Sequence, residues 1–103
     1  MTTEVIFRKF NKRPYETIAI FPQLINPLNG NLTSYMHVGQ HGECDRFFRE
    51  FTRACKDESE YKDLLNELIK IGYDDLKVIQ RVNHGRYLKA YKAARMVLAW
   101  NIL

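Results

Sequence analysis

Two histidines, a cysteine and two acids lie close together in the segment SYMHVGQHGECD. Histidine nitrogen and cysteine sulfur are common ligands of zinc, so His37, His41 and Cys44 are candidate metal ligands. In an extended segment, however, His37 and His41 would lie about 13 Å apart, whereas the ligands of one zinc ion lie within about 4 Å of each other. Only a bend at an intervening glycine would bring the three together. The spacing therefore favours a protein without a bound metal or cofactor.

The same segment contains a cysteine and a histidine, Cys44 and His41, that could act as a nucleophile and its base. Such catalysis also needs an acid that orients the histidine, and an oxyanion pocket. Asp45 follows Cys44 directly, and this placement says nothing about its orientation. Complete serine-hydrolase, phosphate-loop and zinc-protease motifs are missing from the sequence. The sequence favours a non-enzymatic protein.

Positive charge is concentrated at the end of the chain. Residues 1–43 carry four bases and three acids, residues 44–75 carry six bases and nine acids, and residues 76–103 carry six bases and no acid. The three net charges of +1, −3 and +6 add up to the +4 of the whole chain. The terminal bases are Lys77, Arg81, Arg86, Lys89, Lys92 and Arg95. Such a block attracts nucleic acid, an acidic protein surface or anionic lipid.

A helix over about residues 84–100 would display most of these bases. Its apolar stripe, with spacing i, i+4, i+7 and i+11, consists of Tyr87, Tyr91, Ala94 and Leu98. The stripe could pack on a sheet while Lys89 and Lys92 project from the other side. The sequence predicts a nucleic-acid-binding surface in which Arg86, Lys89, Lys92 and Arg95 hold phosphates, and Lys77 and Arg81 add secondary contacts. Tyr87 and Tyr91 would either stack on bases or belong to the core.

The apolar end of the same helix supports a hypothesis of a different class. Met96, Leu98 and Trp100, together with Ile102 and Leu103, are more apolar than one helix face can bury. These residues could form the seam of a homodimer or bind a host protein. Nucleic acid and a protein partner are therefore the two predicted classes of ligand.

The elements that must position these residues begin with a predicted hairpin. EVIFRKF and TIAIFPQL are rich in β-branched and aromatic residues, and the turn NKRPYE separates them. Pro22 is expected to shorten the second strand or to place its end at a sheet edge. A third strand, LTSYMHVG, is expected after the Asn-Gly turn at residues 26–31.

Residues 44–54 fit two different structures. Phe47, Phe48, Phe51 and Cys55 have helical spacing, while Phe47 and Phe51 also fit one face of a strand. We expect a short helix here.

The next segment, DESEYKDLLNELIKIG, predicts a clear amphipathic helix. Asp57 and Glu60 form a capping box at its start, and Gly72 marks its end. LKVIQRV then predicts a strand before the basic helix. The order β-β-β-(α)-α-β-α predicts one α+β domain over residues 1–103, with a mainly antiparallel sheet and helices packed on one face.

Several of these segments resemble a family of small uncharacterised proteins found in phages and bacterial mobile elements. The similar segments are VIFRKF, IAIFP, SYMHVGQHG, EYKDLLNEL and IGYDDLKVI, within roughly residues 5–82. The resemblance implies a small accessory protein of phage or mobile-element origin, and it carries over no catalytic residue. The basic turn NKRPYE and the apolar tail KAARMVLAWNIL depart from what the family leads us to expect.

Two further features bear on the surroundings of the protein. No apolar run approaches the roughly 18 residues of a membrane span, and the start MTTEVIFRKF has acid and base too close together for a signal peptide. The sequence therefore predicts a cytoplasmic protein without a membrane partner. Cys44 and Cys55 form no CxxC motif and are expected to be unpaired, small hydrophobic residues.

Overall fold

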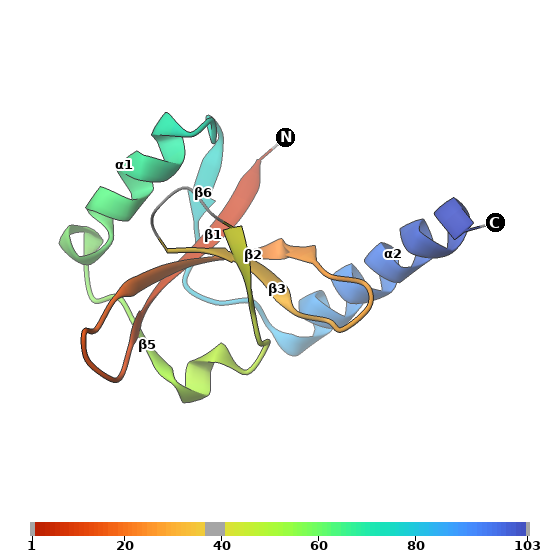
Figure 1. Cartoon of the computed structure of the whole chain (residues 1–103), viewed down its shortest axis with the longest axis horizontal. Coiled ribbons are helices and arrows are strands. Elements are labelled where there is room, and N and C mark those ends of the chain that lie inside the picture. Colours follow the sequence, from red (N-terminus) through yellow and green to blue (C-terminus); the bar gives the residue numbers. More distant parts are fainter. Residues whose placement is uncertain (1, 37–40, 103) are drawn as a thin grey trace.

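Within residues 2–36 and 41–102, which the computed structural model describes, six strands form one sheet and two helices pack against it (Figure 1). The strands are β1 Thr3–Phe10, β2 Thr17–Ile25, β3 Leu32–Tyr35, β4 His41–Cys44, β5 Thr52–Ala54 and β6 Leu76–Val78, and the helices are α1 Lys62–Lys70 and α2 His84–Ile102. The order β4-β3-β2-β1-β5 is antiparallel throughout, and β6 pairs in parallel with β1. The predicted α+β class with a mainly antiparallel sheet is confirmed.

The predicted hairpin is also confirmed, because β1 and β2 pair with Ile6 opposite Ile20. Pro22, however, does not end the second strand, which continues to Ile25. The pairing of β2 with β3 shifts register between Phe21 and Ile25. Proline has no N–H to donate, so an irregular stretch of the ladder can accommodate it within a strand.

The predicted third strand is confirmed for Leu32–Tyr35, and its expected continuation through His37 lies outside the described residues. The strand β4, which pairs with β3, was not predicted. Its sequence, HGEC, contains no run of β-branched or aromatic residues, so local pattern does not mark it as a strand.

The two faces of the sheet carry separate cores, because side chains alternate between faces along a strand. Phe7 packs with Leu68 of α1 on one face. Its neighbour Ile6 packs with Tyr87 of α2 on the other face. The helices therefore cover opposite faces, whereas the sequence led us to expect both on one face. The path of the chain between β6 and α2 determines which face of the sheet α2 covers. The spacing of apolar residues within a helix gives no information about that path.

The segment after β4 is not the predicted short helix. It forms a 3₁₀ turn, η1 Phe48–Glu50, followed by β5, which pairs with the end of β1. The buried Arg8 of β1 explains this outcome: its Nε donates to Thr52 Oγ1 at 2.7 Å, and its guanidinium lies over the Phe48 ring. Thr52 Oγ1 in turn donates to the Phe48 carbonyl at 2.6 Å. These contacts, and the pairing with β1, outweigh the helical spacing of the phenylalanines.

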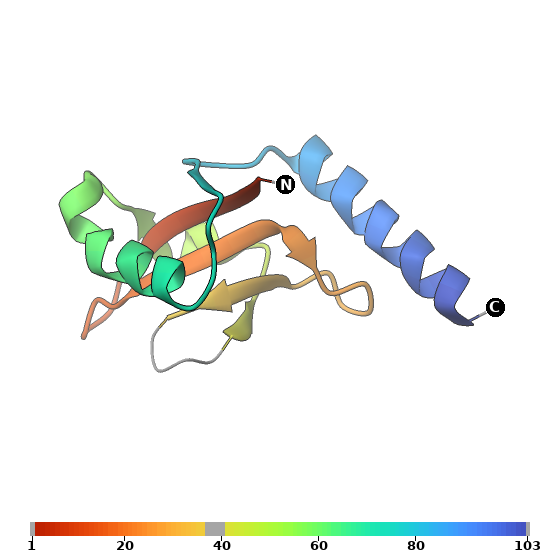
Figure 2. The ribbon, with the colours of Figure 1, turned by 90° about the horizontal axis from the view of Figure 1, so that it is seen from above.

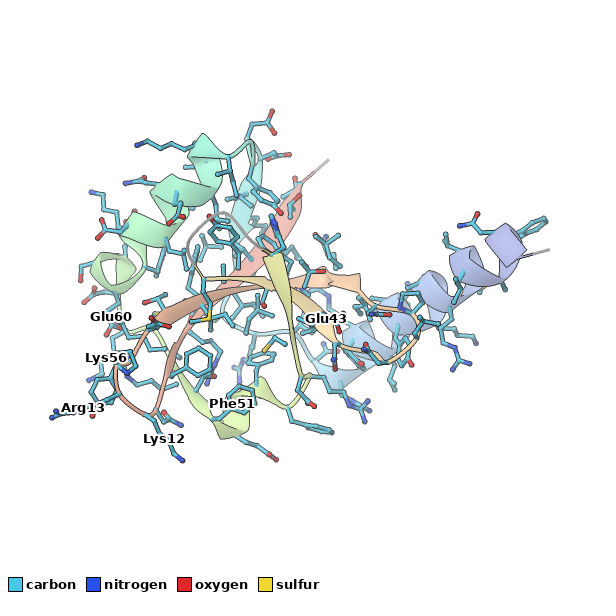
Figure 3. The ribbon with its side chains drawn as sticks, in the orientation of Figure 1. Lys12, Arg13, Glu43, Phe51, Lys56 and Glu60 are labelled. Atoms are coloured by element: carbon cyan, nitrogen blue, oxygen red, sulfur yellow. The ribbon has the colours of Figure 1, made fainter. Side chains whose placement is uncertain are left out.

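Asp57 and Glu60 were predicted to form a capping box at the start of the helix, but they lie at a short 3₁₀ turn that precedes it. Asp57 caps the 3₁₀ turn η2 Glu58–Glu60 by accepting a hydrogen bond from the Ser59 backbone at 2.9 Å, and α1 begins two residues later. Glu60 accepts hydrogen bonds from the Arg53 side chain at 2.7 Å and from the Lys56 backbone (Figure 3). These bonds, the Arg53 contact above all, hold the pKa of Glu60 at about 2, below its ordinary range.

We expect Glu60 to stabilise the protein at neutral pH and to lose this effect in acid. The pKa of Glu60 is about 2 in the folded protein, against roughly 4.3 in an unfolded chain. The stabilisation is therefore complete above the unfolded pKa and disappears as the pH falls towards the folded pKa. Melting temperatures of wild type and Glu60→Gln across this range measure the effect. The gap between the two proteins should shrink below about pH 4, and a gap independent of pH would contradict the assignment.

Helix α2 begins within the predicted basic segment, and much of it extends beyond the sheet. The side chain of Asn83 caps it by accepting from the Arg86 backbone at 2.8 Å. Tyr87 holds the first turns in place, since its hydroxyl donates to the Gly30 carbonyl at 2.6 Å. Figures 1 and 2 show the later turns standing away from the body of the protein. We call these later turns, residues 93–102, the distal half of α2.

Candidate interaction surfaces on α2

The candidate metal ligands do not converge in the part of the chain that the structure describes. In β4, His41 lies among aromatic rings of one face, with Nε2 2.7 Å from the Tyr73 hydroxyl. Cys44 belongs to the core on the opposite face. His37 lies outside the described residues. Among residues 2–36 and 41–102, no group of three or more His, Cys, Asp or Glu side chains could hold a metal ion.

Cys44 and His41 are not placed as a nucleophile and its base either, because they point to opposite faces. Burial, with a smaller contribution from Asp45, raises the pKa of Cys44 to about 11, so the thiol stays protonated at neutral pH. The Asp45 carboxylate accepts a hydrogen bond from the Phe47 backbone at 2.7 Å and so shapes the turn. Both Cys44 and Cys55 are free and buried, as predicted.

Three of the predicted phosphate-binding residues are available on α2. Lys89, Lys92 and Arg95 are exposed, and none of them forms an ion pair within the described part of the chain. Arg86 differs, because its Nη2 lies 2.7 Å from Glu4 Oε1. This contact spans the sequence from the first strand to the last helix, so Arg86 fastens α2 to β1 and its charge is already compensated.

The remaining predicted contacts have different surroundings. Lys77 in β6 and Arg81 in the chain before α2 are both exposed. Tyr87 is only 5% exposed, which makes it a core residue and excludes it from stacking on a base. Tyr91 is half-buried, and the Arg95 guanidinium lies 5.7 Å from its ring centre.

Sequence reasoning missed three residues that the structure brings beside the first turns of α2. The Arg46 guanidinium lies 4.7 Å from the ring centre of Phe47 and 5.4 Å from that of Tyr87. Phe47 is itself 53% exposed, and Arg49 lines the same hollow as His84. The alternation of arginine and phenylalanine in DRFFREF was the available signal, but we interpreted this segment only for its secondary structure.

Three hollows join along one side of α2, and we call their combined surface the α2 groove. Adjacent hollows share Tyr87 or Tyr91. The cationic and aromatic lining residues are Arg46, Arg49, His84, Lys92, Arg95, Phe47, Tyr87 and Tyr91. Among the described lining residues, Asp45 is the one that carries a carboxylate. From His84 to Ala99 the groove follows the helix for roughly 22 Å, at about 1.5 Å per residue.

A second surface of α2 is apolar and exposed. Met96, Val97 and Trp100 are 58%, 61% and 77% exposed. Together with Lys89 and Ala93 they lie on one side of the helix, and we call these five residues the Trp100 face. It adjoins the α2 groove, because Met96 also lines the hollow that contains Lys92 and Arg95, whereas Trp100 lies about 140° from Arg95 around the helix axis.

The predicted interaction residues are thus divided between two sides of α2. Met96 and Trp100 belong to the Trp100 face, whereas Leu98 is half-buried with the tyrosine stripe. Neither α2 nor α1, the helices of the described residues, combines the length and the apolar character needed to cross a bilayer.

Comparison with known proteins leaves the function to be inferred from these surfaces. The resemblance to small phage and mobile-element proteins stays a prediction. No protein-family model, curated protein or solved structure matches this chain.

Proposed function

We propose that the protein binds single-stranded nucleic acid in the α2 groove, as an accessory protein without catalytic activity. One observation carries this proposal: Arg46 and Arg49, which precede β5, line the same side of α2 as Lys92 and Arg95. A positively charged groove that also presents aromatic rings is the usual way in which proteins bind single strands without sequence preference. Each exposed cation can neutralise one phosphate and release its counterions.

The aromatic residues of the groove favour a single strand over a duplex. Phe47 is 53% exposed beside the Arg46 guanidinium, so an unpaired base can stack on its ring, and such stacking contributes about 1–3 kcal/mol. The bases of a duplex already stack on one another, so they cannot use this ring. The guanidinium groups of Arg46 and Arg95 already lie over tyrosine or phenylalanine rings, which holds them in place for phosphates.

Fluorescence anisotropy with labelled single-stranded and duplex oligonucleotides of mixed sequence tests the proposal. We expect the single strand to bind more tightly, with log K falling against log salt at a slope of about −3, or roughly −0.7 for each of four phosphates. Lys92→Glu combined with Arg95→Glu should weaken binding more than roughly tenfold and reduce the slope by about half. Phe47→Ala should weaken binding with the slope unchanged, because it removes stacking and no charge.

The matched control changes the same number of charges on the other face of the sheet. Lys62→Glu with Lys70→Glu alters the net charge equally, and both lysines are exposed on α1. This variant should keep nearly all of the affinity. Equal losses in the two double variants would mean that net charge alone drives binding, and an absence of binding at low salt would disprove the proposal.

A further inference from the structure

The chain carries a second groove, which is lined by apolar and acidic residues. It lies on the face of the sheet that α2 covers in part, between the β1–β2 turn and η1. Two adjoining hollows that share Phe10 and Phe51 form it, and we call it the sheet groove. Its apolar lining consists of Phe10, Ile18, Met36, Cys44 and Phe51. Phe51 is 40% exposed, and Figure 3 shows it near η1, away from α2.

We propose that a second copy of the chain inserts its Trp100 face into the sheet groove, so that two copies exchange the part of α2 from Lys89 onward in a symmetric dimer. The Trp100 face shares Met96 with the proposed nucleic-acid groove, but the inference does not depend on nucleic-acid binding. In one copy Trp100 is 77% exposed and Phe51 of the sheet groove is 40% exposed, and both would be covered in the pair. A twofold axis makes the two contacts identical and closes the assembly at two copies.

Charge complementarity supports this choice of partner. The residues that line the sheet groove include three carboxylates, Glu43, Asp45 and Glu50, against one ammonium group, that of Lys12. Hydrogen bonds from three asparagine side chains lower the pKa of Glu43 and keep it ionised. The Trp100 face, in contrast, carries one base, Lys89, and no acid, on a helix without any acidic residue. An acidic groove and a basic helix attract each other and suppress pairing of two basic helices.

The helix cannot reach the groove of its own chain. Its first turns are fastened to the body by the Tyr87 hydrogen bond to Gly30 and by the ion pair of Arg86 with Glu4. From there the distal half extends away from the molecule (Figure 2), while Phe51 lies below the sheet, well apart from the distal half (Figure 3). A straight helix leaving in this direction meets the groove of another molecule.

Trp100 makes the test direct, because it is the chain's only tryptophan. We expect light scattering after sizing chromatography to give twice the 12.2 kDa of one chain. Serial dilution should shift the Trp100 emission to longer wavelength as the dimer dissociates and the indole enters water. Trp100→Glu should give a monomer, whereas Ile69→Glu, a matched change at an exposed apolar residue of α1, should leave the dimer intact.

An exchange of charges identifies the groove that receives the helix. Lys89→Glu on the Trp100 face and Glu50→Lys in the sheet groove should each weaken the dimer. Mixing the two variants should restore it, because each helix then meets a groove of opposite charge. A monomer at all concentrations, a dimer that survives Trp100→Glu, or a mixture without rescue would overturn the proposal. A monomer whose Trp100 emission responds only to a host protein would overturn it in favour of a different partner.

Discussion

Replacing Leu68 by alanine is expected to destabilise the protein by about 2–5 kcal/mol. Leu68 of α1 is fully buried, at 0% exposure, in the core that Phe7 and Phe21 form on that face of the sheet. The substitution removes buried carbon atoms and leaves a cavity that a paired sheet cannot collapse to fill. Urea titration measures the free energy of unfolding of the wild type and the variant. If this free energy depends equally steeply on urea concentration in both proteins, the difference between them gives the change in stability.

The control for this experiment is the next residue. Ile69 is 53% exposed, so Ile69→Ala should change the free energy of unfolding by less than about 0.5 kcal/mol. The two substitutions shorten aliphatic side chains of equal size in the same helix. Similar losses at both positions would show that α1 does not present Leu68 to the sheet.

Replacing Gly30 by alanine is expected to destabilise the protein by about 2–4 kcal/mol and to loosen α2 from the sheet. Gly30 has φ of 77°, a left-handed conformation that costs other residues about 1–2 kcal/mol. An added Cβ would lie 2.6 Å from the Tyr87 hydroxyl and 3.0 Å from Tyr91 Cε2. It would therefore displace the ring whose hydroxyl binds the Gly30 carbonyl. Urea unfolding measures the loss, and faster amide exchange in the first turns of α2 shows where the structure opens.

Gly72→Ala separates the cost of the left-handed backbone from the cost of the collision with Tyr87. Gly72 also has a positive φ, 123°, but an added Cβ would meet nothing within 4 Å. This variant therefore carries a backbone penalty without a collision. Gly30→Ala should be the more destabilising of the two. The proposed nucleic-acid binding should weaken only in Gly30→Ala, because only this variant displaces Tyr87, over whose ring the Arg46 guanidinium lies. Equal destabilisation would contradict the role of Tyr87 as an anchor.

Much of the fold could be predicted because its signals are local. The β1–β2 hairpin follows from β-branched and aromatic residues on each side of a turn, and α1 follows from leucines at helical spacing. The helix over the basic segment follows in the same way. The prediction was wrong for the segment after Cys44, whose residue spacing fits two structures. There, contacts with residues distant in sequence decided the structure. Phe47 and Phe51 fit a helix by themselves, but pairing with β1 and the buried Arg8 placed the following residues in β5.

Only some residues of the candidate site could be predicted, because the others come from a distant part of the sequence. Lys92 and Arg95 were expected from charge clustering and helical geometry, and the structure places both on the exposed side of α2. Arg46 and Phe47 are about forty positions away in sequence, and no periodicity links them to α2. Arg86 was expected to hold a phosphate, yet it forms an ion pair with Glu4, a contact between the last helix and the first strand.

The sequence by itself determined the α+β class, the hairpin, both helices and the one-sided distribution of charge. These properties depend on neighbouring residues, whose spacing and chemistry act within a few turns or one strand. Only the tertiary structure decided which faces the helices cover, which bases stay free and where exposed apolar surface remains. Those outcomes depend on contacts between residues distant in sequence, such as Tyr87 with Gly30, and such contacts exist only after the sheet has formed.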